Sequence, residues 1–125
     1  MYKSKSSSEG GILQDAERIF THLTQELHIP SEKIIVSGRS IGSGPAVHVA
    51  AGKQVAALIL ISPFTSLREA AASLVGSMAK LFVKDRFHNL EKISKVTSPA
   101  LIIHGKADEI VPYTHSEQLY GSLLP

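Results

Sequence analysis

Three short apolar runs, each followed by a turn and then a helical pattern, constrain the fold more strongly than any other feature of this sequence. The runs cover residues 34–36, 55–61 and 100–103, and none of them alternates with polar residues. Such runs are typical of parallel strands that are covered on both faces. Because helical segments separate the runs, we expect the α/β class, with three parallel strands joined by right-handed crossovers and flanked by helices.

Helical patterns lie before, between and after these runs. A stripe of apolar residues at three- and four-residue steps begins at Ile12 and must stop by Pro30. A second helix is expected over residues 44–51. Capping-box patterns at 66–69 and at 114–117 predict where two later helices begin.

Composition limits the domain organisation and excludes several classes of function. With 125 residues and 43% apolar side chains, the chain has the size of one compact domain, expected over residues 12–125 after a flexible lead-in over residues 1–11. The sequence contains no cysteine, which excludes disulfides, thiolate catalysis and cysteine-ligated metals. It also lacks a helical H-E-x-x-H pattern and an acidic cluster, so neither a metal nor a cofactor is expected.

Charge and hydropathy argue against nucleic acid and against a membrane span. Thirteen basic and eleven acidic side chains are scattered along the chain, and aromatic residues make up only 6%. A nucleic-acid groove needs clustered Lys and Arg with stacking aromatic residues, so no nucleic-acid partner is expected. The longest apolar run, 55–61, is far shorter than a transmembrane segment, and no signal peptide is visible. We therefore expect a cytoplasmic protein.

The most informative motif is G-x-S-x-G, which lies between the first apolar run and the following helix. Gly38, Ser40 and Gly42 provide it. A serine on a sharp strand-to-helix turn presents its hydroxyl above the sheet edge, and glycines on either side remove clashing side chains. The backbone N–H of Ile41 would then face an oxyanion. A glycine-rich turn without catalytic function is the alternative, and the glycine spacing fits a dinucleotide fingerprint poorly.

An acidic residue follows the third apolar run, where the partner of such a serine is expected. Asp108 lies just past this run, beyond a tight turn, and Glu109 is its local competitor. The carboxylate of Asp108 would orient and stabilise the imidazole of a catalytic histidine. The alternative is an aspartate that only caps a turn.

Three segments resemble the α/β-hydrolase superfamily. They are GRSIGSGPA (38–46), LISPFTS (60–66) and DRFHNLEKISKVTSPALIIHGKADEIVP (85–112). More narrowly, they resemble the branch that holds the alpha/beta-hydrolase-domain-containing protein 17 depalmitoylases. The resemblance implies a partial α/β-hydrolase fold, truncated at both ends, with Ser40 as the nucleophile, Ile41 as an oxyanion donor and Asp108 as the triad acid. It also implies an acyl ester or thioester substrate, which includes acylated proteins.

The chain departs from this family in three respects. The family's triad histidine lies farther beyond the acid than this chain extends, and of the six histidines only His115 is a candidate surrogate, whereas His104 looks structural. The strand that supplies the second oxyanion donor would precede Met1, which leaves the edge of the first strand open to self-association. The alternative function is therefore an inactive, hydrolase-like module that acts through binding or oligomerisation. The family's cysteine cluster for membrane attachment is also absent, so peripheral membrane association is expected only of a longer form.

One segment has two interpretations. Residues 74–87 include Met78, Leu81, Phe82 and Val83, which could line an acyl pocket or form a helix face packed on the sheet. Packing is the favoured interpretation.

Overall fold

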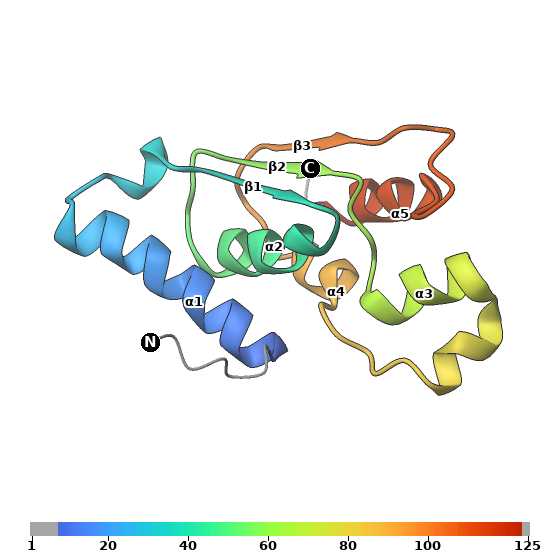
Figure 1. The fold of residues 1–125 in the computed structure, drawn as a ribbon. Coiled ribbons are helices and arrows are strands. Elements are labelled where there is room, and N and C mark those ends of the chain that lie inside the picture. Colours follow the sequence, from blue (N-terminus) through green and yellow to red (C-terminus); the bar gives the residue numbers. More distant parts are fainter. Residues whose placement is uncertain (1–7, 124–125) are drawn as a thin grey trace.

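The three expected strands pair in parallel in the computed structural model, which describes residues 8–123 (Figure 1). They are β1 (Ile35–Arg39), β2 (Ala57–Ile61) and β3 (Ala100–Ile103), and their order in the sheet is β1-β2-β3. The predicted α/β class with three parallel strands and flanking helices is therefore confirmed. Because each strand follows the previous one both in sequence and in space, every connection is a crossover that carries a helix.

Helices occupy the connections between the strands and both ends of the described chain. They are α1 (Glu9–Thr21), α2 (Ser43–Gly52), α3 (Leu67–Val75), α4 (Asn89–Ile93) and α5 (Thr114–Ser122). A π-helical turn at His22–Glu26 continues α1, and short 3₁₀ helices lie at Ser31–Lys33, Ser40–Gly42 and Ser77–Leu81.

The first helix begins earlier than the apolar stripe predicts. Its first residue is Glu9, and the Ser8 hydroxyl accepts a hydrogen bond from the Gly11 N–H at 3.1 Å. This cap satisfies one of the free N–H groups at the helix start, so residues that we expected in a flexible lead-in are helical. The remainder of that lead-in, residues 1–7, lies outside the described residues.

The two expected capping boxes have different outcomes. At α3 the Ser66 hydroxyl accepts from the Glu69 N–H at 3.3 Å, as the pattern predicts. At α5 the predicted box does not form, because the N-cap is Tyr113 and no side chain caps the helix. The N–H groups of Ser116 and Glu117 donate to the Tyr113 carbonyl instead. A backbone carbonyl therefore already accepts from the N–H that the Thr114 hydroxyl was expected to bind.

The main core lies between one face of the sheet and the helices. Leu58 and Leu60 of β2 have no exposed surface, and Val47 of α2 and Ile93 of α4 pack against the same core. The register places Val36 beside Leu58 and Gly38 beside Leu60, so these residues point to the same side as the helices. Figure 1 shows α1, α2 and α4 together below the strands.

The opposite face of the sheet is not covered by the described residues, which corrects the expectation of strands buried on both faces. We call it the open face; its residues are Ile35, Ser37, Arg39, Ala57, Ile59, Ile61, Leu101 and Ile103. Ile35 is 58% exposed and Leu101 54%. The reason is topological. Right-handed crossovers that progress in one direction across a sheet all place their helices on the same face.

The outer edge of β1 is also open. In the part of the chain that the structure describes, β1 pairs only with β2, so alternate residues leave their N–H and C=O groups unpaired at this edge. A hollow of about 470 Å³ lies between α1 and this edge, lined in part by Ile19, Leu23, Ile35 and Pro45. The expected open edge is therefore present.

The favoured interpretation of residues 74–87, packing on the sheet, is wrong for Met78, Leu81 and Phe82, which are exposed, whereas Phe87 at the end of the segment is buried. Met78 is 71% exposed and Phe82 84%. Gly76, at φ +100°, ends α3 and turns the chain into the 3₁₀ helix, where only the small Ala79 is buried. Figure 1 shows this helix, in yellow, projecting away from the strands. Across residues 8–123 no helix combines the length and the hydropathy that a membrane span needs.

Candidate functional site

The three strands end at the same edge of the sheet, and each is followed by a residue with polar chemistry. Arg39, Ile61 and Ile103 are in register at the strand ends, so Ser40, Ser62 and His104 follow at one edge. In open parallel sheets, ligands bind at the carboxyl ends of the strands. The candidate site therefore lies at this edge.

Ser40 occupies a strained backbone conformation between β1 and α2. Its φ is +49°, a region that residues other than glycine rarely adopt, and the residue is exposed. Such conformations persist only where the surrounding structure enforces them. The following 3₁₀ helix, Ser40–Gly42, leads directly into α2, so the N-terminal end of these helices, where N–H groups are free, lies next to Ser40.

The two glycines of the motif differ in what they do. A Cβ atom at Gly38 would collide with the Gly42 backbone and would lie 2.8 Å from the Ala46 Cβ. Only glycine therefore allows β1 to approach the start of α2 so closely. At Gly42, by contrast, φ is −65° and an added Cβ would meet no atom of the described residues within 4 Å. The expected steric role is thus present at Gly38 and missing at Gly42.

The Ile41 N–H is the first backbone donor after Ser40. The hydrogen bonds recorded among residues 8–123 include none from this N–H, and it belongs to the first turn after β1. The Ser43 N–H, one turn later, already bonds to the carbonyls of Ser40 and Ile41. The geometry is therefore compatible with the predicted oxyanion donor.

Asp108 caps a turn beyond β3 and also faces a histidine. Its Oδ1 accepts from the N–H groups of Ile110 and Val111, both at 2.9 Å, and its Oδ2 lies 3.4 Å from His104 Nε2. The hydrogen bond from Val111, with smaller contributions from Ile110 and His104, lowers the pKa of the carboxyl although partial burial opposes the shift. The carboxylate is therefore ionised well into the acid range. Asp108 can therefore cap the turn through Oδ1 and still orient a histidine through Oδ2, because Oδ2 accepts no backbone hydrogen bond.

His104 is fixed by contacts on both ring nitrogens. Its Nε2 lies 2.6 Å from the Val111 carbonyl oxygen, which can only accept, so Nε2 carries a proton. Its Nδ1 lies 2.6 Å from the Ser116 hydroxyl. The ring joins the end of β3 to α5, in agreement with the structural role that the resemblance implies.

His115 cannot serve as the surrogate base in this structure. The Thr65 N–H donates to His115 Nδ1 at 3.2 Å, so this nitrogen is unprotonated. The other nitrogen, Nε2, lies 3.1 Å from the Ser73 hydroxyl, which itself donates to the Glu69 carbonyl. Nε2 is therefore the protonated nitrogen. Burial lowers the pKa of His115, although Glu69 opposes the shift, so the ring is neutral at neutral pH.

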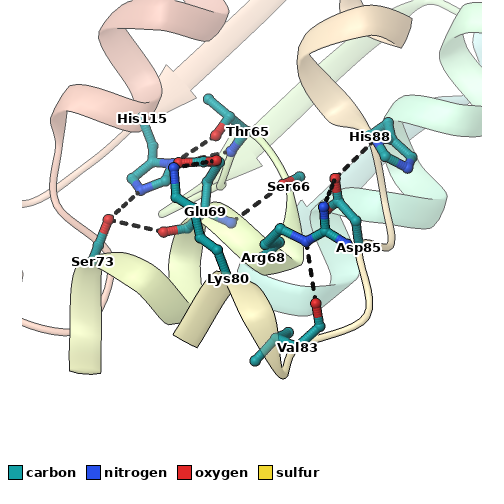
Figure 2. A network of polar contacts seen from close by, with 10 residues as sticks. All are labelled: Thr65, Ser66, Arg68, Glu69, Ser73, Lys80, Val83, Asp85, His88 and His115. Atoms are coloured by element: carbon teal, nitrogen blue, oxygen red, sulfur yellow. Dashed lines mark hydrogen bonds and ion pairs between the residues drawn. The ribbon is translucent and has the colours of Figure 1, made fainter. Parts of the chain in front are cut away.

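Figure 2 shows that His115 belongs to a polar network around α3. Lys80 forms an ion pair with Glu69 at 2.8 Å, and the Arg68 Nε donates to the Val83 carbonyl at 3.2 Å. A further histidine, His48, contacts Glu17 at 2.7 Å. None of the hydrogen bonds among the described residues joins a histidine to Ser40, and these residues contain no group of three potential metal ligands.

Sequence reasoning missed one residue of this edge. Ser62, directly after β2, has φ +47°, and its N–H donates to the Ile103 carbonyl at 2.8 Å. Two adjacent strands thus end in serines with positive φ. No pattern in the sequence distinguishes Ser62 from an ordinary serine before a proline.

Comparisons with known proteins agree with the motifs. The sequence matches the profile of the prolyl oligopeptidase family over residues 5–124. It is 38% identical over 117 residues to alpha/beta hydrolase domain-containing protein 17B of Homo sapiens, and 35% identical over 113 residues to alpha/beta hydrolase domain-containing protein aho-3 of Caenorhabditis elegans. These alignments cover 94% and 90% of this chain but 40% and 33% of the two relatives. The chain therefore spans less than half the length of these curated relatives.

Solved structures share the fold. An alpha-beta hydrolase from Vibrio vulnificus superposes with a TM-score of 0.75 and 23% identity, over 94% of this chain and 48% of that one. A puromycin-hydrolyzing peptidase from Mycobacterium tuberculosis superposes with a TM-score of 0.71 and 14% identity, over 89% and 19%. The resemblance drawn from the motifs is confirmed at the level of family and fold. The chain belongs to the prolyl oligopeptidase family and forms part of an α/β-hydrolase fold.

Proposed function

We propose that this chain is the nucleophile-bearing part of a serine hydrolase that cleaves acyl esters or thioesters. The observation that carries the proposal is the positive φ of Ser40 at a turn between β1 and α2, held over a glycine that no other residue could replace without a clash. A strained turn of this kind presents a serine hydroxyl at the top of an α/β-hydrolase sheet. Membership of a hydrolase family supports the same chemistry.

The proposed reaction uses three groups of this chain. The Ser40 Oγ attacks the carbonyl carbon while its proton passes to a general base, and the Ile41 N–H donates to the developing oxyanion. The base then protonates the leaving alcohol or thiol, which leaves an acyl group on Ser40, and water hydrolyses this ester. Asp108 would orient the base and stabilise its protonated form.

The general base is the group that the described residues do not bring to Ser40. His104 and His115 have partners on both ring nitrogens. Loss of a triad histidine costs on the order of 10⁶-fold in turnover. We therefore expect the 125-residue chain alone to hydrolyse esters at a rate close to that of the Ser40→Ala variant.

An added base provides the test. We would measure hydrolysis of p-nitrophenyl acetate by the purified chain at increasing imidazole, beside Ser40→Ala and Ser37→Ala. Ser37 is an exposed serine of β1, three residues earlier. After subtraction of the rate that imidazole gives without protein, we expect an imidazole-dependent rate, and an acetyl adduct that maps to Ser40, in the chain and in Ser37→Ala but not in Ser40→Ala. An equal rate in all three proteins at every imidazole concentration would contradict the nucleophile role.

Acylated proteins are the first substrate class to test. The resemblance to the depalmitoylase branch supports thioesters of long acyl chains on cysteine. The same three proteins would be compared on a palmitoyl-thioester peptide, with release of the free thiol as the readout. If short p-nitrophenyl esters react and the peptide does not, this substrate class is contradicted. The nucleophile role of Ser40 would still stand.

A non-catalytic binding module is the second candidate. It is favoured by the unpaired edge of β1 and by the open face, where Ile35 and Leu101 are more than half exposed. Association through these surfaces together with an unreactive Ser40 would support this candidate over the hydrolase.

A further inference from the structure

The segment Phe87–Asn89 lies against the first turn of α2, which follows the 3₁₀ helix that begins at Ser40. The Asn89 side chain has no exposed surface, and its Nδ2 donates to the Ser43 hydroxyl at 3.1 Å and to the Phe64 carbonyl at 2.9 Å. Ser43, likewise fully buried, is the first residue of α2. A single buried amide therefore ties the start of α2 to the loop after β2.

Phe87 makes a second contact with the same turn. Its ring packs so closely on Gly44 that a Cβ atom there would lie 2.6 Å from the ring Cγ. The φ of Phe87 is +53°, which is an outlier for a bulky residue. Two hydrogen bonds hold this conformation, because the Phe87 N–H donates to Glu9 Oε1 at 2.7 Å and its carbonyl accepts from the Asn89 N–H at 2.8 Å.

The hydrogen bonds of Asn89 indicate that its side chain acts through the two donor hydrogens on Nδ2. Its Oδ1 is buried without a hydrogen-bond partner among the described residues. A buried acceptor that is unsatisfied destabilises a protein, so a site of this kind calls for an explanation. An apolar side chain of similar size would avoid that cost but could not donate to Ser43 and Phe64.

We propose that Asn89 is a positioning residue for the Ser40 turn, because its buried amide bonds to Ser43 and Phe64 and so fixes the first turn of α2 against the loop after β2. Through this turn Asn89 sets the positions of Ser40 and of the Ile41 N–H. The catalytic meaning of this contact rests on the proposed nucleophile role of Ser40, whereas the contact itself is testable without any reaction.

The test is amide hydrogen exchange, measured residue by residue by NMR on the ¹⁵N-labelled chain. Asn89→Leu removes both donors and keeps a side chain of similar size. Ile93→Val is the matched control, since Ile93 is a fully buried residue of the same helix and belongs to the main core. We expect Asn89→Leu to accelerate exchange of the first protected amides of α2 by about tenfold or more relative to those of β2 and β3. Ile93→Val should accelerate all three groups alike.

Acceleration that is uniform over α2, β2 and β3 in Asn89→Leu would overturn the proposal, because it would indicate a general loss of stability. If Asn89→Leu does not fold, Ser43→Ala removes the acceptor alone and should give the localised effect, whereas Ser43→Thr keeps the hydroxyl and should restore the wild-type pattern. Equal patterns in Ser43→Ala and Ser43→Thr would also overturn it. A localised effect in a chain that forms no acyl adduct on Ser40 would support the positioning role while contradicting the proposed function.

Discussion

At the residue scale, a close contact explains the motif glycines better than the freedom of glycine to adopt a positive φ does. The serine of the motif adopts a positive φ, whereas the flanking Gly42 has an ordinary one, and Gly38 is needed because it touches the backbone of Gly42. The motif therefore encodes a close approach of strand and helix. The conformational strain is carried by Ser40 itself.

The two glycines give a direct comparison. Gly38→Ala should lower the free energy of unfolding by about 1–3 kcal/mol, since a methyl group in an already packed contact forces the backbone to move. Gly42→Ala, at an ordinary φ and facing open space, should leave stability unchanged or raise it slightly. Urea unfolding of both variants checks this. Equal destabilisation by the two substitutions would show that the contact at Gly38 does not limit the turn.

A pH effect follows from His115. Because its folded pKa is lowered, the unfolded chain binds more protons near and below the ordinary value of 6.5. The contribution of His115 to stability should thus be complete above that value and decline as the pH falls through it toward the lower folded pKa. Protonation of Nδ1 also removes the acceptor of the Thr65 N–H.

We expect the free energy of unfolding to decrease between pH 7.5 and pH 5 and the decrease to be smaller in His115→Gln, which does not titrate there. Denaturant unfolding at several pH values provides the measurement. His28→Gln, at an exposed position, is the control and should retain the wild-type slope. A wild-type slope in His115→Gln would contradict the assignment.

At the element scale, whether a capping pattern forms depends on where the preceding chain goes. Ser66 has extended backbone angles and bonds to the Glu69 N–H as predicted. Thr114 is likewise followed three residues later by a glutamate, but the helix begins one residue earlier than this pattern predicts. The reason is that Tyr113 is helical and its carbonyl accepts the first N–H groups. The local pattern predicted both helices and only one of the two caps.

This difference predicts unequal effects of two similar substitutions. Ser66→Ala should lower the free energy of unfolding by about 1 kcal/mol, which is typical for the loss of an N-cap. Thr114→Ala should change it by less than about 0.5 kcal/mol, as at surface sites without special contacts. Thermal or urea unfolding of both variants is sufficient. A cost at Thr114 equal to that at Ser66 would mean that both boxes form in solution.

At the scale of the whole molecule, the direction of the crossovers explains the distribution of apolar surface. The connecting helices α2 and α4 lie on one face, so the apolar residues of the other face are exposed although the strands read as buried ones (Figure 1). The chain covers 40% of the length of its relative from Homo sapiens. The unpaired edge of β1 and the open face are both left uncovered by the described residues.

We expect the isolated chain to self-associate through these surfaces as its concentration rises, because exposed apolar sheet surface favours association. Leu101→Lys places a charge on the open face and should shift sedimentation toward the monomer. Val75→Lys, at an even more exposed apolar position at the end of α3, should not. Identical behaviour of the two variants would place the contact elsewhere.

The sequence by itself determined the three strands, their parallel arrangement, the Ser40 turn and the position of Asp108, because each depends on local features: apolar runs, glycine spacing and polar residues at strand ends. Only the tertiary structure decided which face of the sheet is covered, that His115 bonds to Thr65 and Ser73, and that Met78 and Phe82 are exposed. These outcomes depend on contacts between segments far apart in the chain. From the sequence alone, the same apolar or polar side chain is compatible with a buried and with an exposed position, because its neighbours in space are not known.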